Sequence, residues 1–173
     1  MSRTITVVAG NPKPASRTLA AARLVAEQFA DDPAEIGEVD VIKLGVGLLG
    51  WGDEAVARAV STVRSSDIVV IASPTYKATY TGVLKLFLDQ FDAANGLAGV
   101  TAIPLMLGAG PAHFMAPEVH LKPLLVELGA TVPCAGLYLG DKTFDEPGAF
   151  DAWLGQWRAS VEATADALLA TRR

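Results

Sequence analysis

The chain has 173 residues, of which 51% are hydrophobic and 19% charged, and its formal net charge is −5 at pH 7. This length and composition predict a single globular domain over residues 1–173, with a substantial buried core. A net negative charge offers no broad attraction to phosphate-rich surfaces, so nucleic acid and acidic lipid are not expected as partners.

Cysteine usage and hydropathy define the expected setting. Cys134 is the single cysteine, so no intramolecular disulfide can form. There is no Cys/His cluster to suggest a metal site. No signal-peptide layout is present, and no apolar window approaches the roughly 18 residues of a membrane span. We therefore expect a reducing, cytoplasmic setting, without a membrane or a metal ion.

The first part of the chain alternates an apolar run with helical spacing. Residues 4–9 form a strand candidate, and a helix is expected to begin at Ser16. Its buried stripe would consist of Leu19, Ala22, Ala26 and Phe29. A weaker strand is predicted over residues 39–44. A glycine-rich loop then leads to a second helix, whose inward face would be Val56, Ala59, Val60 and Val63.

The same alternation continues to the end of the sequence. Strands are predicted over residues 68–72, 100–107 and 132–139, with helices over residues 113–128 and 150–169. Another helix, before residue 100, would bury Leu84, Phe87, Leu88 and Phe91. Near-continuous apolar strands that alternate with helices predict an α/β fold, with a five-stranded parallel sheet covered by helices on both faces.

Prolines interrupt two of these predicted elements. Pro104 lies inside the strand at 100–107, where its missing N–H predicts a bulge or irregular pairing. Pro117 and Pro123 both fall in the helix at 113–128. Pro123 should disturb the helical hydrogen bonds before it, so we expect a kink or a π-bulge there.

In a parallel α/β sheet, ligands bind outside the carboxyl ends of the strands. The loop after the first strand reads AGNPKPASRT and ends at a helix amino terminus, which favours an anion. It carries the neutral polar residues Asn11, Ser16 and Thr18 and the cations Lys13 and Arg17. Both GxxxxGK[ST] and GxGxxG are missing, so a phosphate monoester is favoured over a diphosphate. The alternative is a surface turn in which Ser16 is an ordinary N-cap.

The loop after the third predicted strand contains a proline–tyrosine turn. Pro74 restricts the backbone and shapes the turn. The amides of Thr75, Tyr76 and Lys77 are expected to face a planar heterocycle, which the Tyr76 ring would shield. The alternative places Tyr76 in the core or in a subunit interface, and for Tyr80 this alternative is favoured.

The loop after the fourth predicted strand reads LGAGPAHF. Gly108 and Gly110 would allow a ligand to approach the backbone closely. His113 would lie near that approach, and His120 would follow on a similar face of the next helix. The alternative is a flexible loop with a solvated His113 and a packed His120.

Together these loops resemble the NADPH-dependent FMN reductase family of flavodoxin-like proteins, over nearly the whole chain. The phosphate-loop motif of that family, G-S-P-R…S-R-[ST], is matched by Gly10-Asn11-Pro12-Lys13 and Ser16-Arg17-Thr18. The P-x-Y-[KN]…[ST]-G-x-[LF]-K-x-x-[LI]-D block is matched by Pro74, Tyr76, Lys77, Thr81, Gly82, Leu84, Lys85 and Asp89. The G-G…A-H…L-K-P segment is matched by Gly108, Ala112, His113, Leu121, Lys122 and Pro123.

The resemblance implies a three-layer sandwich with strand order 2-1-3-4-5 and an FMN site at these loops, to which Ala109 would also contribute. Hydride would pass from NADPH or NADH to the flavin, with no catalytic protein side chain. Asn11 and Lys13 replace the usual serine and arginine of the family. Because lysine lacks the bidentate guanidinium, looser FMN retention is expected.

The similarity is greatest to the flavin reductases of two-component alkanesulfonate monooxygenase systems, which implies release of reduced FMN to a partner monooxygenase. Two alternatives stay open: a reductase of quinones, azo dyes or metal ions that retains its FMN, and a non-enzymatic flavodoxin-type electron carrier. The resemblance also implies a homodimer or homotetramer packed through the helix after residue 81 and its neighbours.

Overall fold

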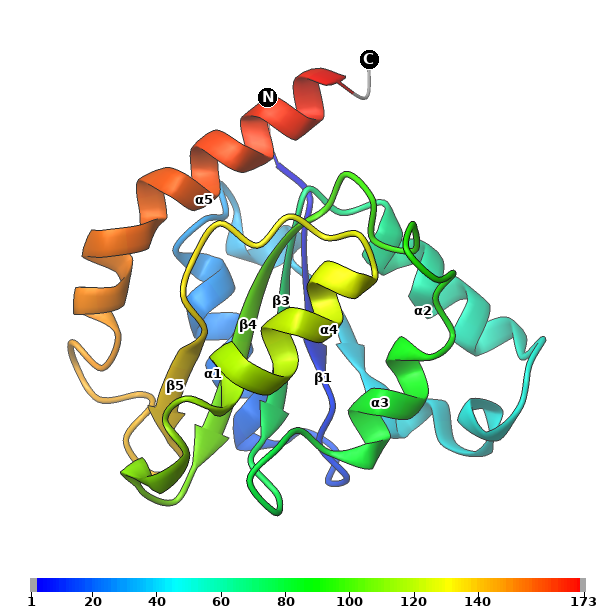
Figure 1. The fold of residues 1–173 in the computed structure, drawn as a ribbon, viewed down its shortest axis with the longest axis horizontal. Coiled ribbons are helices and arrows are strands. Elements are labelled where there is room, and N and C mark those ends of the chain that lie inside the picture. Colours follow the sequence, from blue (N-terminus) through cyan, green and yellow to red (C-terminus); the bar gives the residue numbers. More distant parts are fainter. Residues whose placement is uncertain (1–2, 172–173) are drawn as a thin grey trace.

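The computed structural model describes residues 3–171 and contains one sheet of five parallel strands (Figure 1). These strands are β1 (Ile5–Ala9), β2 (Gly37–Asp40), β3 (Ile68–Pro74), β4 (Thr101–Gly108) and β5 (Leu137–Gly140). They are arranged in the order β2-β1-β3-β4-β5, and every neighbouring pair is parallel. The predicted fold class and strand order are therefore confirmed.

Helices cover both faces of this sheet. They are α1 (Arg17–Glu27), α2 (Glu54–Arg64), α3 (Gly82–Leu88), α4 (Lys122–Glu127) and α5 (Asp151–Thr171). In Figure 1, α4 crosses in front of the sheet and α1 lies behind it. One core cluster joins the sheet to α1 and α5, and the other joins it to α2, α3 and α4. No helix in the described part of the chain has the length and apolarity needed to cross a membrane.

The central strands are apolar throughout because each contributes to both cores. In β3, Ile68 and Val70 pack toward α1 and α5, whereas Val69 and Ile71 pack toward α2, α3 and α4. All four side chains are fully buried. Alternation of side chains between two buried faces produces the unbroken apolar runs seen in the sequence.

The apolar stripes predicted for the helices are largely confirmed. Ala22 and Ala26 of α1, Val56 and Val63 of α2, and Leu84, Phe87 and Leu88 of α3 are buried. Leu19, Ala59 and Val60 pack against the cores while partly exposed, and Phe29 and Phe91 lie just beyond a helix end and are still buried.

The two largest differences from the predicted strand boundaries are at the end of β2 and the start of β5. The chain leaves the sheet after Asp40, where a short 3₁₀ segment, η2 (Val41–Leu49), replaces the expected continuation to residue 44. On the other edge, β5 begins at Leu137 rather than at residue 132. The amide of Gly136 donates to the Glu118 carboxylate at 2.7 Å instead of to a strand neighbour, so the chain joins the sheet late.

The bulge predicted at Pro104 is absent, whereas the irregular pairing offered as its alternative is found on the β5 side. The β3–β4 register runs continuously through the Ile71–Pro104 pair. The amide of Ala102 donates to Thr131 on the β5 side, and alternation directs the Pro104 nitrogen to that same side. Pairing between β4 and β5 resumes only at Leu105, so the missing N–H falls in a gap of the ladder.

The expected disturbance before Pro123 is confirmed. The predicted helix is divided into a 3₁₀ turn, η3 (Pro111–His113), a π-helical turn, η4 (Pro117–Leu121), and the α-helix α4. The Lys122 amide donates to the carbonyl of Pro117, five residues earlier, which is π-helical bonding. Pro123, the next residue, has no N–H to continue a regular ladder.

Candidate functional site at the carboxyl edge of the sheet

The loops that follow β1 and β3 are bonded directly to each other. The Gly10 amide donates to the Ala72 carbonyl at 2.8 Å, and the Thr81 hydroxyl donates to the Gly10 carbonyl at 2.5 Å. A Cβ on Gly10 would lie 2.3 Å from that of Leu84 in α3. Only glycine allows this close approach, which holds the two loops together.

The loops after β4 and β5 join the same unit. The Thr75 amide donates to the Leu107 carbonyl at 2.6 Å, and the Asp141 amide donates to the Gly108 carbonyl at 2.9 Å. Between the four loops lies a cavity of about 330 Å³. It is lined by Asn11, Lys13, Ala15, Ser16, Arg17, Thr18, Pro74, Thr75, Tyr76, Leu107, Gly108, Ala109 and Asp141.

The structure brings together every predicted site residue except Lys77, Gly110 and His113. Lys77 is exposed in the turn beyond Tyr76, and His113 is exposed in η3. The Gly110 carbonyl accepts a hydrogen bond from the Tyr138 hydroxyl at 2.7 Å, outside the cavity lining. His120 is exposed on η4, so the alternative that packed it in the core was wrong.

The loop after β1 combines an N-cap with free amides. The Ser16 hydroxyl accepts from the Leu19 amide at 3.3 Å, so Ser16 is the N-cap of α1. The Asn11 side chain donates to the Thr18 hydroxyl at 2.9 Å. Within the described residues, the amides of Arg17 and Thr18 have no hydrogen-bond partner. Unpaired amides at the positive end of a helix are suited to an anion.

A buried carboxylate that the sequence analysis missed supports this loop. Ala15 has φ 48°, a left-handed conformation unfavourable for alanine, and its amide donates to Asp40 Oδ2 at 3.0 Å. Asp40 ends β2 beside Ala9 and lies 3.6 Å from Lys43. Its other oxygen, Oδ1, is buried without a partner among the described residues. The strand predicted here ran to residue 44, so the sequence did not mark Asp40 as the end of a strand.

The loop after β3 forms a strained turn. Tyr76 and Thr79 exchange backbone hydrogen bonds of 2.9 and 3.2 Å across Lys77 and Ala78, whose φ angles are 51° and 69°. Positive φ at both central positions defines a type I′ turn, which normally carries asparagine and glycine. The amides of Thr75 and Tyr76 are therefore already engaged, so the expectation that they face a ligand was wrong.

The two tyrosines of this loop differ in exposure. Tyr76 is 52% exposed at the mouth of the cavity, whereas Tyr80 packs against the core, as favoured. The Thr75 hydroxyl is buried beside Tyr138 but makes no well-formed hydrogen bond within the described residues. An unpaired buried hydroxyl in a cavity wall can bond a polar ligand.

Tyr138 explains the need for glycine at the end of β4. A Cβ on Gly108 would lie 1.8 Å from the Tyr138 hydroxyl, whereas open space surrounds Gly110. Burial raises the pKa of Tyr138. The close approach predicted for Gly108 is thus made by a tyrosine of the same chain.

Charge in the cavity is unevenly distributed. Lys13 has no ion pair with any described residue, so its ammonium is available to an anion. Arg17 lies 3.2 Å from the Asp141 carboxylate, which the sequence analysis did not single out. Asp141 follows β5 directly, and this position at a strand end could have identified it.

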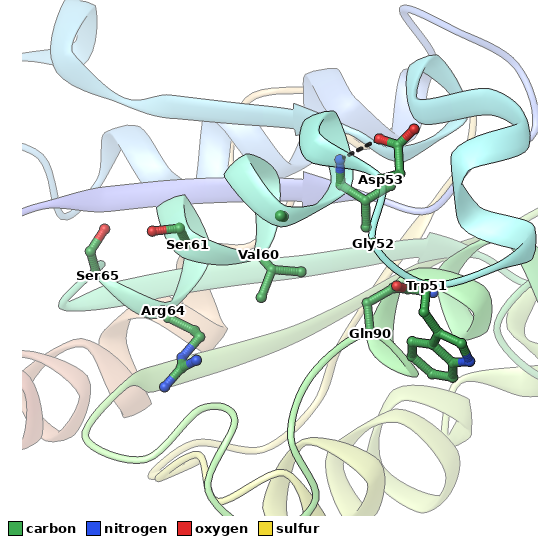
Figure 2. Close-up of a pocket in the computed structure, with 10 residues that line it drawn as sticks. Trp51, Gly52, Asp53, Val60, Ser61, Arg64, Ser65 and Gln90 are labelled. Atoms are coloured by element: carbon green, nitrogen blue, oxygen red, sulfur yellow. Dashed lines mark hydrogen bonds between the residues drawn. The ribbon is translucent and has the colours of Figure 1, made fainter.

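A larger groove of about 570 Å³ runs along α2 (Figure 2). Figure 2 shows Trp51 at one end, Arg64 toward the other end and Val60 between them. Asp53 caps α2, Gln90 donates to Gly50, and Arg64 lies 3.6 Å from Asp92. None of the predicted site residues lines this groove, and these polar side chains are already paired.

Comparison with known proteins places this geometry in a family. The family model for NADPH-dependent FMN reductase matches residues 3–168. FMN reductase (NADPH) of Escherichia coli is 35% identical over 79 residues, which are 46% of this chain and 41% of that protein. The aligned part therefore spans less than half of that relative.

Two further relatives align over most of their length. NADH-dependent FMN reductase SfnF of Pseudomonas putida is 26% identical over 162 residues, covering 85% of each chain. The crystal structure of an apo NADH:FMN oxidoreductase (EMOB) superimposes with a TM-score of 0.79 at 27% identity, covering 95% of this chain and 89% of that one. The chain belongs to the NADPH-dependent FMN reductase family.

Proposed function

We propose that this protein is an NAD(P)H-dependent FMN reductase, an oxidoreductase whose carboxyl-edge cavity binds FMN. The observation that carries the proposal is the convergence of the loops after β1, β3, β4 and β5 around one cavity of about 330 Å³. Anion-binding groups and the exposed Tyr76 ring both line that cavity. The family membership of the chain supports this assignment.

The phosphate of FMN would lie at the amino terminus of α1. The free amides of Arg17 and Thr18 point outward from the first turn of the helix, and Lys13 supplies an unpaired cation. Asn11 and Ser16 are bonded within the loop and hold its shape. A phosphate monoester suits this arrangement because it is small, anionic and rich in acceptors.

The ring of the flavin would lie at the Tyr76 end. A cavity of about 330 Å³ is at the small end of the range for cofactor sites, so part of a bound flavin would extend to the mouth. Tyr76 would border the ring, the Thr75 hydroxyl would pair with a polar ring atom, and the Lys77 amide remains as a backbone donor. An exposed flavin face is what a nicotinamide nucleotide requires.

The chemistry itself would come from the cofactors. When bound, FMN supplies a hydride-accepting ring nitrogen to NADPH or NADH, so the cavity needs no protein nucleophile. The chain's own residues would bind the phosphate, position the ring and leave one side accessible. His113, Ala109 and Gly110, in and beside the loop after β4, are the candidate contacts for the nicotinamide nucleotide.

The destination of the reduced flavin is the second part of the proposal. Lys13 stands where the family carries arginine, and a single ammonium holds phosphate less specifically than a guanidinium fork. We therefore favour release of reduced FMN to a partner monooxygenase over retention for reduction of quinones, azo dyes or metal ions. The single buried cysteine is consistent with a cytoplasmic setting.

Steady-state oxidation of NADPH and NADH, with and without added FMN, FAD and riboflavin, tests this proposal. We expect the purified protein to lack bound flavin and to oxidise the nicotinamide only when flavin is added. A preparation that keeps FMN and rapidly reduces a quinone would support the retaining alternative. No change in flavin absorbance or fluorescence on titration would contradict the flavin site.

A homodimer or homotetramer is part of the same proposal. The large exposed apolar side chains outside the cavity belong to segments on the α2–α3–α4 side of the sheet or beside it: Val46, Leu49, Trp51, Leu86, Phe114, Met115, Val119 and Val126. Within residues 3–171, none comes from α1 or α5. Apolar side chains concentrated on one side favour association through that side.

Substitution of Trp51, which is 78% exposed, tests the association. Trp51→Glu should lower the mass measured by size-exclusion chromatography with light scattering, whereas Gln156→Glu on α5 should leave it unchanged. A wild-type monomer at micromolar concentration would contradict the homo-oligomer. An unchanged oligomer in Trp51→Glu would exclude Trp51 from the interface.

A further inference from the structure

Asp141 holds Arg17 with two separate groups. The Arg17 guanidinium donates to the Asp141 backbone carbonyl at 3.0 Å, and its other terminal nitrogen lies 3.2 Å from Asp141 Oδ2. Both residues line the carboxyl-edge cavity. One cation of the candidate phosphate end is therefore paired with a carboxylate inside the same cavity.

The position of Asp141 does not depend on its carboxylate. Its amide donates to the Gly108 carbonyl at 2.9 Å, and it follows directly after Gly140, the last residue of β5. The sheet thus places the Asp141 backbone at the cavity wall. The side chain is 27% exposed and that of Arg17 is 59% exposed, so the pair is open to incoming ions.

We propose that Asp141 sets the strength of phosphate binding, and so the preference for FMN over riboflavin, by adding negative charge to the cavity. This inference rests on the proposed function, because it requires the FMN phosphate at the amino terminus of α1. A phosphate monoester carries a charge of roughly −1.5 to −2 at pH 7. Lys13 and Arg17 attract it, and the Asp141 carboxylate opposes it.

The sign of this effect follows from the two groups that hold Arg17. The backbone carbonyl of Asp141 bonds Arg17 whatever side chain residue 141 carries. Removal of the carboxylate charge therefore leaves the guanidinium in place and frees part of its charge for phosphate. An ion that competes with the ligand for the same cation weakens the binding of that ligand.

Because the Asp141 charge weakens phosphate binding, bound FMN should exchange readily with free FMN. Riboflavin lacks the phosphate, so its affinity should not depend on the charge of Asp141. FMN carries the phosphate in both redox states, so Asp141 would weaken the retention of both oxidised and reduced FMN. A negative charge at residue 141 is thus a device for keeping FMN a substrate rather than a permanent prosthetic group.

Dissociation constants of FMN and riboflavin, measured by fluorescence titration of the wild type and Asp141→Asn, test the inference. We expect Asp141→Asn to bind FMN about three- to tenfold more tightly, with the riboflavin constant unchanged. The gain should shrink at high salt, because ions screen exposed charges. Asp141→Glu, which keeps the charge, should retain the wild-type ratio of the two constants.

Asp145→Asn is the matched control. It removes the same charge from the same loop, but Asp145 does not line the cavity, so the FMN constant should not change. If Asp141→Asn folds poorly, Asp141→Ser provides the same comparison, because it also keeps the backbone carbonyl.

Three outcomes would overturn the inference. They are an Asp141→Asn variant with equal or weaker FMN binding, equal tightening of FMN and riboflavin, and an equal gain in Asp145→Asn. Failure of the proposed function would look different, because the wild type would then bind neither flavin. That result would remove the inference as well.

Discussion

The two main cavities of this protein differ in a way that their volumes do not reveal. The groove along α2 is the larger, at about 570 Å³ against about 330 Å³. Yet the Asp53, Arg64 and Gln90 side chains of the groove are bonded to groups of the protein itself. In the smaller cavity, the Thr75 hydroxyl, the Thr18 amide and the Lys13 ammonium are unpaired within residues 3–171.

The difference reflects how each region is built. The groove lies along the side of a helix, whose backbone groups are satisfied internally. The smaller cavity lies where parallel strands end and a helix begins, so backbone groups are left without intrahelical partners. Free hydrogen-bonding groups, rather than volume, distinguish the candidate site from the groove.

The largest expected effect concerns the buried carboxylate behind the smaller cavity. Asp40→Ala removes the acceptor of the strained Ala15 amide and should weaken FMN binding by about 1.5–3 kcal/mol, roughly 10- to 150-fold. Asp40→Asn keeps an acceptor oxygen and should lose much less. Arg64→Ala in the groove should leave FMN binding unchanged. Flavin titration measures all three variants. Weaker FMN binding by Arg64→Ala would indicate that the groove, rather than the smaller cavity, holds the flavin.

Gly108 offers a steric test at the cavity wall. A methyl group there displaces the Tyr138 ring and breaks its hydrogen bond to Gly110, so Gly108→Ala should lower the free energy of unfolding by about 1–3 kcal/mol. FMN affinity should fall with it. Gly110→Ala, in open space, should change the free energy of unfolding by less than about 0.5 kcal/mol. Urea denaturation measures both, and equal losses would contradict this explanation.

Replacement of alanine by glycine should have opposite effects on the stability of the fold in the two regions. Ala78→Gly relieves the φ of 69° in the turn beside the cavity and should stabilise the fold by up to about 1 kcal/mol. Ala57→Gly, in the middle of α2 beside the groove, should destabilise it by about 0.5–1 kcal/mol. Thermal unfolding compares them. A destabilising Ala78→Gly would show that the turn is not strained.

The smallest effect concerns a thiol outside both cavities. Burial raises the pKa of Cys134 from 9.0 to about 12, and the side chain is 1% exposed. The folded protein therefore keeps a proton that the unfolded chain releases between pH 9 and 12. The free energy of unfolding should be unaffected by this group below pH 9 and should fall as the pH rises toward 12.

Thiol-reagent kinetics at pH 8 measure this protection directly. Cys134 should react slowly in the native protein and rapidly in urea, because only the exposed thiolate is nucleophilic. Fast modification of the native protein would show that the thiol is accessible.

Local pattern was enough to predict the sheet, its helices and most of the residues that line the smaller cavity. Alternating apolar runs and helical stripes predicted five parallel strands, and the carboxyl-edge rule then selected the loops that line the smaller cavity. Pro123 predicted the irregular turn before it, because a missing N–H acts within the same helix. These features depend on neighbours in the sequence, so the sequence alone determined them.

The tertiary structure decided which hydrogen-bonding groups were left free. Asp40, Tyr138 and Asp141 reach the site across long sequence separations, and the amides of Thr75 and Tyr76 are taken by partners that no local pattern specifies. The late start of β5 has the same cause, since Gly136 bonds to Glu118. In each case, groups distant in the sequence compete for one hydrogen-bond donor or acceptor. Only the tertiary structure determines which of them forms the bond.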